Sequence, residues 1–271
     1  MTDVAAELRQ RNKAVWGAGE WDDVANLVAS VGPKVLDSVG IDPGMEVLDV
    51  GAGTGGNVAI PAALRGAQVV ASDLVPDHFD TGRSRAAEAG VEIEWVEADA
   101  EALPFDDGSF DRVLSTFGHM FAPRHKRAGA ELARVCRSGG AVGTATWRPT
   151  GFAGELFATM GKHLPAAPDF AQPPGLWGDE GHAREMLEPH GLDLEFHHET
   201  VVFLHDGDAD SFTTYYEEKF GPVVTAKAAL GDDWPALRSD LVTLFEKWNQ
   251  AGEGKLEVPS EYLLTIGRKR G

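Results

Sequence analysis

Short apolar runs alternate with longer stretches of helical periodicity between residues 46 and 147. The apolar runs predict five β-strands, at residues 46–50, 68–72, 91–96, 110–115 and 141–147. Residues 58–64, a stretch before Gly90 that contains Arg83 and Arg85, and a stretch around 131–135 predict the helices between them. Strands that alternate with helices across short loops predict a parallel sheet with helices on both faces.

The pattern changes on both sides of this segment. Residues 3–16 and 23–39 predict two N-terminal helices, and residues 148–191 contain two helical pieces around a proline-rich loop. Residues 194–204 and 256–267 predict two more strands, which a helical stretch at 210–250 separates. Such a strand pair would form a hairpin with an antiparallel last strand and a helical insertion over one end of the sheet.

Together these elements predict an α/β fold in four segments. The fold is a Rossmann-like, seven-stranded, mostly parallel sheet with helices on both faces, an antiparallel last strand and a helical cap. We expect residues 1–44 to form helices that are part of a lid, and residues 45–147 to form the nucleotide-binding core. Residues 148–191 would belong to the cap, and residues 192–271 would hold the last two strands with an insertion at about 208–252.

The net charge of this 271-residue chain limits the kinds of molecule that it is expected to bind. It carries 24 basic and 43 acidic residues, a net charge of −19, which repels nucleic acid and anionic lipid. The N-terminus is polar and no long apolar stretch occurs, so we expect a cytoplasmic protein without a membrane span. Cys136 is the single cysteine, which excludes a disulfide within the chain, and no ligand spacing predicts a metal site.

A glycine-rich turn follows the first predicted strand and indicates a nucleoside ligand. Glycines let backbone N–H groups approach a small ligand because no Cβ stands in the way. Two patterns fit this turn. Gly51-x-Gly53-x-x-Gly56 matches the dinucleotide fingerprint, whereas Asp49 with Gly51-x-Gly53-x-Gly55 matches the loop that binds S-adenosyl-L-methionine (SAM).

Carboxylates at three strand ends favour the second pattern. Ligands in such sheets bind beyond the carboxyl ends of the strands. Asp73 ends the second strand, where a carboxylate accepts hydrogen bonds from ribose hydroxyls in either cofactor class. Asp49 lies inside the first strand, which suits a cationic sulfonium ligand with a free ammonium better than a pyrophosphate. Asp99 follows the third strand, where a carboxylate can accept the adenine amino hydrogen.

Residues 45–147 resemble the class I SAM-dependent methyltransferases, in particular their ubiquinone/menaquinone-methyltransferase-like branch that acts on small molecules. The resemblance rests on five motifs in a fixed order. They are Val47-Leu48-Asp49-Val50-Gly51-Ala52-Gly53-Thr54-Gly55, Ser72-Asp73, Asp99-Ala100 with Leu103-Pro104-Phe105, Phe110-Asp111, and Arg134-Val135-Cys136-Arg137-Ser138-Gly139-Gly140. The predicted hairpin of the last two strands also fits the usual end of that fold.

The resemblance implies a set of cofactor contacts along one edge of the sheet. By position they are Asp49, Gly51, Ala52, Gly53, Gly55, Asp73, Leu74, Asp99, Ala100 and Thr116. The glycine turn would hold the methionine and ribose portions, and Asp49 would support the ammonium group. Thr116 would offer its backbone to the methionine end.

The remaining positions would surround the adenosine portion. Asp73 would take the ribose hydroxyls, Leu74 would pack on the adenine, and Asp99 with Ala100 would read the adenine edge. The segment from Trp16 to Trp21 has two interpretations. Either Trp16 belongs to a flap that closes over the cofactor, or both tryptophans pack in the core.

Methyl transfer from a sulfonium is an in-line displacement in which the protein mainly aligns the acceptor with the methyl group. A general base helps when the acceptor is a phenol, an enol or an amine. His119, in the loop after the fourth strand, is the best candidate, because the ordinary pKa of histidine, about 6.5, lies near neutral pH. The alternative is a loop histidine that packs locally.

The sequence thus predicts a methyltransferase that uses SAM and acts on a small, apolar or aromatic acceptor. Aromatic residues in the predicted cap supply the apolar surface, although most of them also suit a core. An NAD-dependent oxidoreductase and a SAM-binding module without turnover stay as alternatives. A homodimer is compatible with the sequence.

Overall fold

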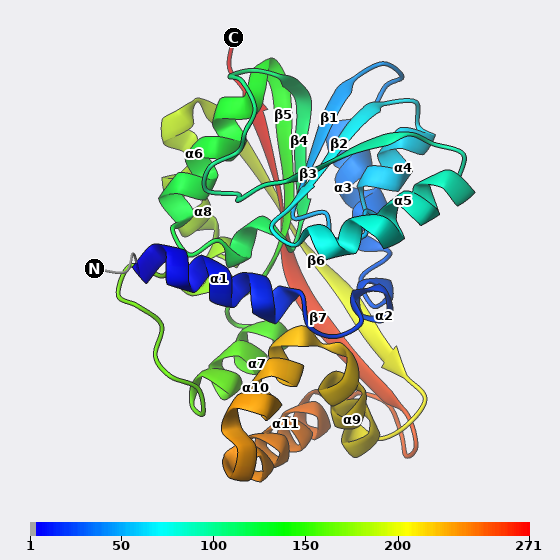
Figure 1. Cartoon of the computed structure of the whole chain (residues 1–271), viewed down its shortest axis with the longest axis vertical. Helices are drawn as coiled ribbons and strands as arrows, with labels where there is room; N and C mark the ends of the chain where they lie inside the picture. Colours follow the sequence, from blue (N-terminus) through cyan, green and yellow to red (C-terminus); the bar gives the residue numbers. More distant parts are fainter. Residues whose placement is uncertain (1–3) are drawn as a thin grey trace. The chain divides into compact units, whose positions relative to one another are not determined.

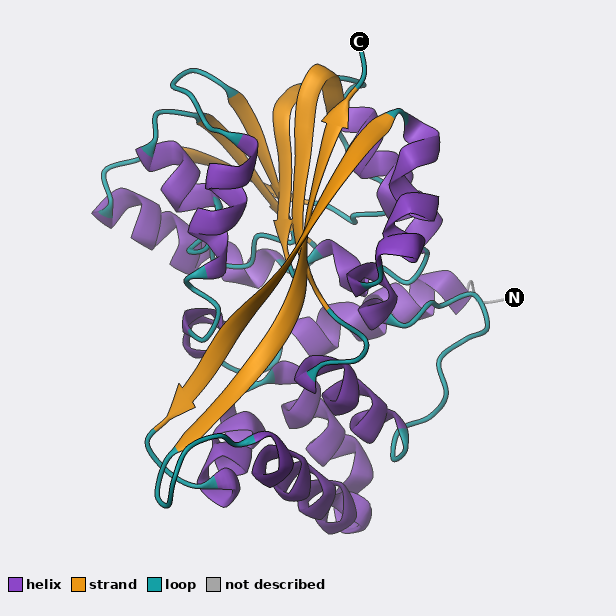
Figure 2. Ribbon diagram, turned by 180° about the vertical axis from the view of Figure 1, so that it is seen from behind, coloured by secondary structure: helices purple, strands orange, loops and turns teal. Residues whose placement is uncertain are grey.

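The computed structural model describes residues 4–271, and in this range seven strands form one mixed sheet of order β3-β2-β1-β4-β5-β7-β6. Strands β1 to β5 pair in parallel, and β7 runs antiparallel to β5 (Figure 2). The strands are β1 (Glu46–Val50), β2 (Gln68–Asp73), β3 (Ile93–Glu97), β4 (Phe110–Thr116), β5 (Cys136–Trp147), β6 (Leu192–His205) and β7 (Leu256–Lys269). The predicted fold, including its antiparallel last strand, is confirmed.

Helices cover both faces of the sheet, as Figure 1 shows for α3, α4 and α5 on one side and α6 and α8 on the other. These helices are α3 (Val31–Val39), α4 (Ala59–Leu64), α5 (Phe79–Glu88), α6 (His125–Val135) and α8 (Glu180–Leu187). α3 packs on β4 and β5 from one side, and α6 packs on the same strands from the other. Strands covered on both faces are mostly apolar, which explains Val47, Leu48 and Val50 in β1, all of which are buried.

Several strand boundaries differ from the predicted ones, most of them by one or two residues, and the differences in β5 and β3 are the most informative. β5 begins at Cys136 instead of residue 141, so the expected turn at Ser138-Gly139-Gly140 lies inside the strand, where Gly139 has φ +77°. β3 begins at Ile93 and ends at Glu97, two residues later and one residue later than predicted. Both differences lie at strand ends, where polar and glycine residues carry no periodic signal.

The described chain divides into two compact units. The first contains the residues up to Leu27, Glu155–Ala166 and Val202–Pro259, and the second contains Val28–Gly154, Ala167–Val201 and Ser260–Gly271. Strands β6 and β7 run from one unit into the other, as does α7 (Phe152–Gly161). The predicted helix at 3–16 is found as α1 (Val4–Trp16), and Asp3 lies outside the described residues.

The first unit is helical. It holds α1, α2 (Trp21–Asn26), α9 (Ala209–Lys219), α10 (Gly221–Leu230) and α11 (Trp234–Trp248). Its core is aromatic, with ring centroids 4.7 Å apart for Phe212 and Tyr216, and 4.9 Å apart for Phe212 and Phe245. The N-terminal segment is fixed to α9, because the Glu20 amide donates to the Lys219 carbonyl at 2.9 Å.

Short 3-10 helices complete the secondary structure. They are η1 (Pro76–His78), η2 (His119–Phe121), η3 (Pro174–Gly178), η4 (Glu188–His190) and η5 (Gly231–Asp233). None of the helices in residues 4–271 is long and apolar enough to cross a membrane. The helices that position the site described next are α4, α5 and α6, together with η2 and η3.

Candidate functional site

The glycine turn after β1 folds back on the end of β2. Gly51, Gly53 and Gly55 have φ values of +69°, +54° and +75°, which side chains other than glycine adopt only with strain. The amides of Gly51 and Ala52 both donate to the Ser72 carbonyl, at 2.8 and 3.0 Å. Helix α4 begins only at Ala59, so a short irregular segment separates the turn from the helix.

This turn lies directly against the loop that follows β4. A Cβ placed on Gly51 would lie 2.6 Å from the Cα of Gly118, and a Cβ on Gly118 would lie 2.7 Å from the Cα of Gly51. Real Cβ atoms do not approach other atoms so closely. Glycine at both positions therefore brings the ends of the two central strands together.

Asp49 lies in β1, two residues before the glycine turn, and is buried, and only one of its two carboxylate oxygens has a hydrogen-bond partner. Its Oδ2 accepts a hydrogen bond from the Ala59 amide at 3.1 Å, whereas its Oδ1 is buried without a partner. Burial raises the pKa of Asp49 to about 7; the negative charge of Asp73 adds to the increase and the Ala59 hydrogen bond opposes it. The unpartnered oxygen fits a cationic hydrogen-bond donor, such as the ammonium group of SAM.

Asp73, the last residue of β2, holds the middle of the glycine turn. Its Oδ2 accepts from the Gly53 amide at 2.7 Å, and its Oδ1 accepts from the Val75 amide at 2.9 Å. Burial raises the pKa of Asp73, and the hydrogen bonds from Val75 and Gly53 oppose the increase. Leu74 follows and is half-buried.

The loop after β3 is tied to the start of α6 by a buried glutamate. Asp99 Oδ1 accepts from the Glu101 amide at 2.9 Å, and Ala100, between them, is half-buried. The Glu101 side chain accepts from the Arg124 amide at 2.6 Å and from Arg124 Nε at 2.5 Å. This pair connects the loops after β3 and β4.

Two residues of α6 hold the Leu103-Pro104-Phe105 turn. Glu131 Oε2 accepts from the Leu103 amide at 2.7 Å. The Arg134 guanidinium donates to the Leu103 carbonyl at 3.0 Å and to the Phe105 carbonyl at 2.7 Å. The turn that carries part of the sequence resemblance is thus fixed by backbone contacts to one helix.

The loop after β4 contains strained backbone. Phe117 has φ +58° and is the single non-glycine residue with a positive φ among residues 4–271. Its ring stacks on Trp147 at a centroid distance of 3.8 Å. Thr116, before it, is half-buried and pairs with Ala145 of β5. Strain of this kind is concentrated at functional sites.

His119 lies in η2, beside the glycine turn. Its amide donates to Ser115 Oγ at 3.0 Å, and Ser115 Oγ in turn donates to the Val50 carbonyl at 2.6 Å. The imidazole is buried, neither ring nitrogen has a hydrogen-bond partner, and the ring centroid lies 4.7 Å from that of Trp177. Burial, with a smaller effect of His125, lowers the pKa of His119 to about 3.

The low pKa changes what is expected of His119. The sequence suggested a base matched to neutral pH, but an imidazole with a pKa of about 3 is neutral and weakly basic. His125 is placed similarly, with a pKa lowered to about 3 by burial and by His182, and its Nδ1 lies 2.8 Å from His182 Nε2. The catalytic role of His119 stays a prediction.

Trp16 belongs to the helical unit that contains α1, α2 and α9 to α11. Its ring centroid lies 5.1 Å from that of Trp21, which in turn lies 5.8 Å from Phe220. Packing of this segment within its own unit is therefore established. The contact between Trp16 and a cofactor stays a prediction.

Comparisons with known proteins agree with this geometry. A family profile described as Methyltransferase domain matches residues 47–140, which contain the glycine turn and all the strand ends described above. The demethylmenaquinone methyltransferase of Renibacterium salmoninarum is 41% identical over 124 residues, 44% of this chain and 50% of that protein. The chain belongs to the class I SAM-dependent methyltransferases. The resemblance to this family, inferred from the sequence, is confirmed.

Two relatives match the methyltransferase over most of its length. Both are uncharacterized proteins of Mycobacterium tuberculosis. One is 42% identical over 222 residues, 82% of this chain and 81% of its own length. The other is 36% identical over 267 residues, 97% of this chain and 96% of its own length.

Solved structures show the same fold. YcgJ of Bacillus subtilis has a TM-score of 0.61 at 19% identity, with 89% of this chain and 98% of that chain covered. Phosphoethanolamine N-methyltransferase 2 of Haemonchus contortus, in complex with SAM, has a TM-score of 0.53 at 16% identity, with 89% and 53% covered. At such identities the likeness shows the fold alone.

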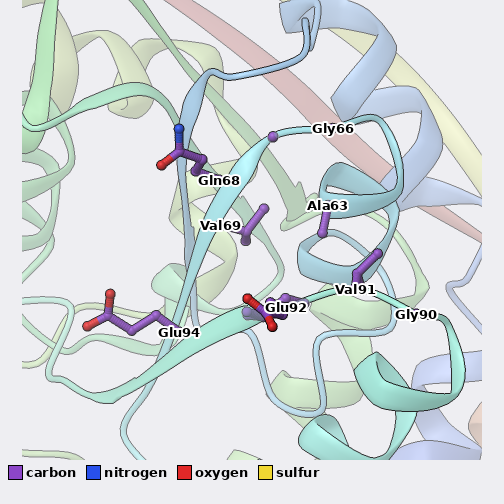
Figure 3. A pocket seen from close by; sticks show the side chains of 10 residues that line it. Ala63, Gly66, Gln68, Val69, Gly90, Val91, Glu92 and Glu94 are labelled. Atoms are coloured by element: carbon purple, nitrogen blue, oxygen red, sulfur yellow. The ribbon is translucent and has the colours of Figure 1, made fainter.

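A cavity of about 650 Å³ in the methyltransferase lies away from this site. It is bordered by Gln68, at the start of β2, and by Glu92 and Glu94 around the start of β3 (Figure 3). These are the amino ends of the two strands, whereas the glycine turn and Asp73 lie at carboxyl ends. The cavity is therefore separate from the candidate site.

Sequence reasoning assigned no structural role to three residues that organise the methyltransferase site. Glu101, Glu131 and Arg134 connect the loops after β3 and β4 with α6. The spacing of Glu131 and Arg134, three residues apart on a helix, was the available signal, since it places both side chains on one face. Among the described residues, no group of three or more His, Cys, Asp or Glu side chains is arranged to hold a metal ion.

Proposed function

We propose that this methyltransferase moves a methyl group from SAM to a small apolar or aromatic acceptor by in-line displacement. The observation that carries the proposal is the pair of carboxylates around the glycine turn. Asp73 fixes the turn through Gly53, and Asp49 keeps one buried oxygen without a partner. A cationic amino-acid tail would supply the missing donor, whereas the pyrophosphate of a dinucleotide would add negative charge.

In this proposal the residues of the site would take the roles that the family resemblance implies. Gly51, Ala52, Gly53 and Gly55 would surround the methionine and ribose portions of SAM. Asp73 would accept from the ribose hydroxyls, which requires its oxygens to bind the ligand in addition to the amides that they hold now. Leu74, Asp99 and Ala100 would contact the adenine, and the backbone of Thr116 would face the methionine end.

SAM supplies an activated methyl group whose leaving group is a neutral thioether, so no acid is needed to assist its departure. The acceptor atom forms the new bond to the methyl carbon and, where it carries a proton, releases that proton to a base or to water. His119 is the proposed base, and its neutral imidazole offers one unprotonated nitrogen. The position and strain of Phe117 and the burial of His119 suit a site from which water is excluded.

The proposal also covers the lid and cap segments, the class of acceptor, and the location and assembly of the protein. Residues 1–44 and 148–191, together with the insertion at about 208–252, would form the lid and cap over a core of residues 45–147, with Trp16 in the flap. The net charge of −19 supports a small-molecule acceptor in place of nucleic acid. We expect a cytoplasmic enzyme, either as a monomer or as a homodimer.

Calorimetric titration of the purified protein with SAM, with S-adenosylhomocysteine and with NADH tests the proposal. We expect both adenosyl ligands to bind and NADH to leave the signal unchanged. Binding of NADH without binding of either adenosyl ligand would overturn the proposal in favour of an oxidoreductase. Binding of SAM that never leads to S-adenosylhomocysteine in the presence of an acceptor library would favour a SAM-binding module.

A further inference from the structure

The indole of Trp95 fills a slot between two glycines that are far apart in the sequence. Trp95 lies on β3, Gly55 is the last glycine with positive φ in the turn after β1, and Gly82 lies inside α5. A Cβ on Gly55 would lie 2.7 Å from Cη2 of Trp95, and a Cβ on Gly82 would lie 2.2 Å from the same atom. One ring edge therefore touches both glycines.

The backbone conformation at position 82 does not require a glycine. It lies in the interior of a helix without a positive φ, where alanine is the better helix former. The space that its Cβ would need is occupied by the Trp95 ring, which lies 2.6 and 2.7 Å from that position at Cζ3 and Cζ2. Gly82 thus accommodates the indole, and the indole reaches the glycine turn through the gap.

Neighbouring contacts keep the indole and the turn in place. The Phe79 ring, also on α5, lies 5.5 Å from the Trp95 ring and is buried. Arg85, one helical turn after Gly82, donates from Nη1 to Thr54 Oγ1 at 3.2 Å. α5 and β3 therefore contact the glycine turn at two adjacent residues, Thr54 and Gly55.

We propose that Trp95 is a positioning residue for the cofactor-binding turn. It supports Gly55 from the side of the sheet, so that the amides of the turn keep the spacing that the methionine and ribose portions of SAM require. Preorganised binding groups cost less ordering when the ligand arrives, so loss of the support would weaken binding. This inference rests on the proposed function, because it assigns Trp95 to the turn that would bind SAM.

The affinity test compares Trp95→Ala with Trp95→Phe in calorimetric titrations with S-adenosylhomocysteine. We expect Trp95→Ala to raise the Kd about tenfold and Trp95→Phe to recover part of the loss, because a phenyl ring fills part of the space that the indole occupies. Leu132→Ala is the matched control: Leu132 is fully buried on α6, in the same unit, and has no role in the turn. It should lower the melting temperature without changing the Kd.

A double-mutant cycle tests the contact itself. Gly82→Ala should weaken ligand binding when Trp95 is present, because the methyl group displaces the indole, and should have no effect on binding in a Trp95→Ala background. Equal effects in the two backgrounds would contradict the contact. A Kd for Trp95→Ala within twofold of the wild-type value would overturn the positioning role.

Hydrogen exchange separates failure of this inference from failure of the proposed function. Without ligand, the amides of Gly53 and Gly55 should exchange faster in Trp95→Ala than in Leu132→Ala, measured in the folded proteins below their transitions. If the wild-type protein binds no adenosyl ligand and this difference is found, the proposed function fails and the support by Trp95 stands. If exchange is the same in both variants, the support fails whatever ligand binds.

Discussion

The amide of Gly53 donates a 2.7 Å hydrogen bond to Oδ2 of Asp73, so the end of β2 fixes the centre of the glycine turn after β1. The same carboxylate accepts from the Val75 amide through Oδ1. Asp73 therefore organises the site before any ligand arrives. Ligand hydroxyls would add to a carboxylate that is already held in place by two backbone donors.

Replacement of Asp73 should weaken SAM binding and loosen the turn together. Asp73→Ala removes both hydrogen bonds, and we expect the Kd for SAM to rise roughly 10- to 100-fold, as for other charged hydrogen bonds. Asp73→Asn keeps one acceptor oxygen and should lose less affinity. Calorimetric titration measures both, with Asp80→Ala, on the exposed start of α5, as a control that leaves the Kd unchanged. Equal Kd values for wild type and Asp73→Ala would contradict the assignment.

The affinity for SAM should increase with pH because of Asp49. The pKa of this carboxyl is raised to about 7, so much of it is protonated below that pH, and a cationic ligand prefers the ionised form. We expect the Kd to fall as the pH rises from about 5.5 to about 8, with proton release on binding near neutral pH. Titrations in buffers of different ionisation enthalpy detect the released proton.

Asp49→Asn is the matching variant, since it keeps the shape of the side chain and removes its titration. Its affinity for SAM should be lower at high pH and nearly independent of pH over this range. A wild-type affinity that does not change with pH, or an equal pH dependence in the variant, would show that Asp49 does not face the cation.

Buried His119 and His125 should make the protein sensitive to acid. Their pKa values in the folded protein are lowered to about 3, from an ordinary value of 6.5. At pH values between these two pKa values, the unfolded chain binds more protons than the folded one. The free energy of unfolding therefore falls as the pH falls below about 6.5. Each histidine contributes a slope of at most about 1.4 kcal/mol per pH unit in this window.

Urea unfolding of His119→Gln between about pH 4 and pH 7 tests this prediction. The variant should lose less stability on acidification than the wild-type protein, even if it is less stable at neutral pH. His197→Gln is the control, because the side chain of His197 is 44% exposed. Parallel pH curves for wild type and His119→Gln would contradict the burial of a neutral imidazole.

Arg134 should be important for stability because of the turn that it holds. Its guanidinium holds the carbonyls of Leu103 and Phe105, and its replacement by alanine leaves both without this donor. We expect Arg134→Ala to lower the free energy of unfolding by about 2 kcal/mol. Arg134→Lys should recover only part of this free energy, because an ammonium group lacks the planar fork that reaches both carbonyls.

The comparison for this variant is Arg83→Ala on α5, which removes an exposed ion pair with Asp80. Such pairs contribute little, so the change should stay within about 0.5 kcal/mol. Urea denaturation at one pH measures all three variants. If Arg134→Ala is as stable as Arg83→Ala, the turn at 103–105 does not depend on α6.

The first strand and the glycine turn could be predicted because they leave local signals. The apolar residues Val47 and Leu48, which are buried, predict a strand. The glycines at positions 51, 53 and 55, which follow directly, predict a turn. The extension of β5 back to Cys136 could not be seen, because Ser138-Gly139-Gly140 has the composition of a turn and is held in the strand by its neighbours.

The contacts between loops could not be predicted from the sequence, for a different reason. Glu101 meets Arg124, and Trp95 meets Gly55 and Gly82, only after the strands have been placed side by side. Likewise, the exposure of His119 depends on Trp177, which is 58 residues away in the chain and covers its ring. A histidine in a loop suggests a solvated base, whereas packing by a distant segment gives it a pKa of about 3.

A crystal structure with S-adenosylhomocysteine tests the central claim most directly. We predict that the ligand lies along the glycine turn, with its ammonium group on Asp49 Oδ1, its ribose hydroxyls on Asp73 and its adenine beside Asp99. The result that would contradict the account is a ligand bound elsewhere, or one whose ammonium group leaves Asp49 Oδ1 without a partner.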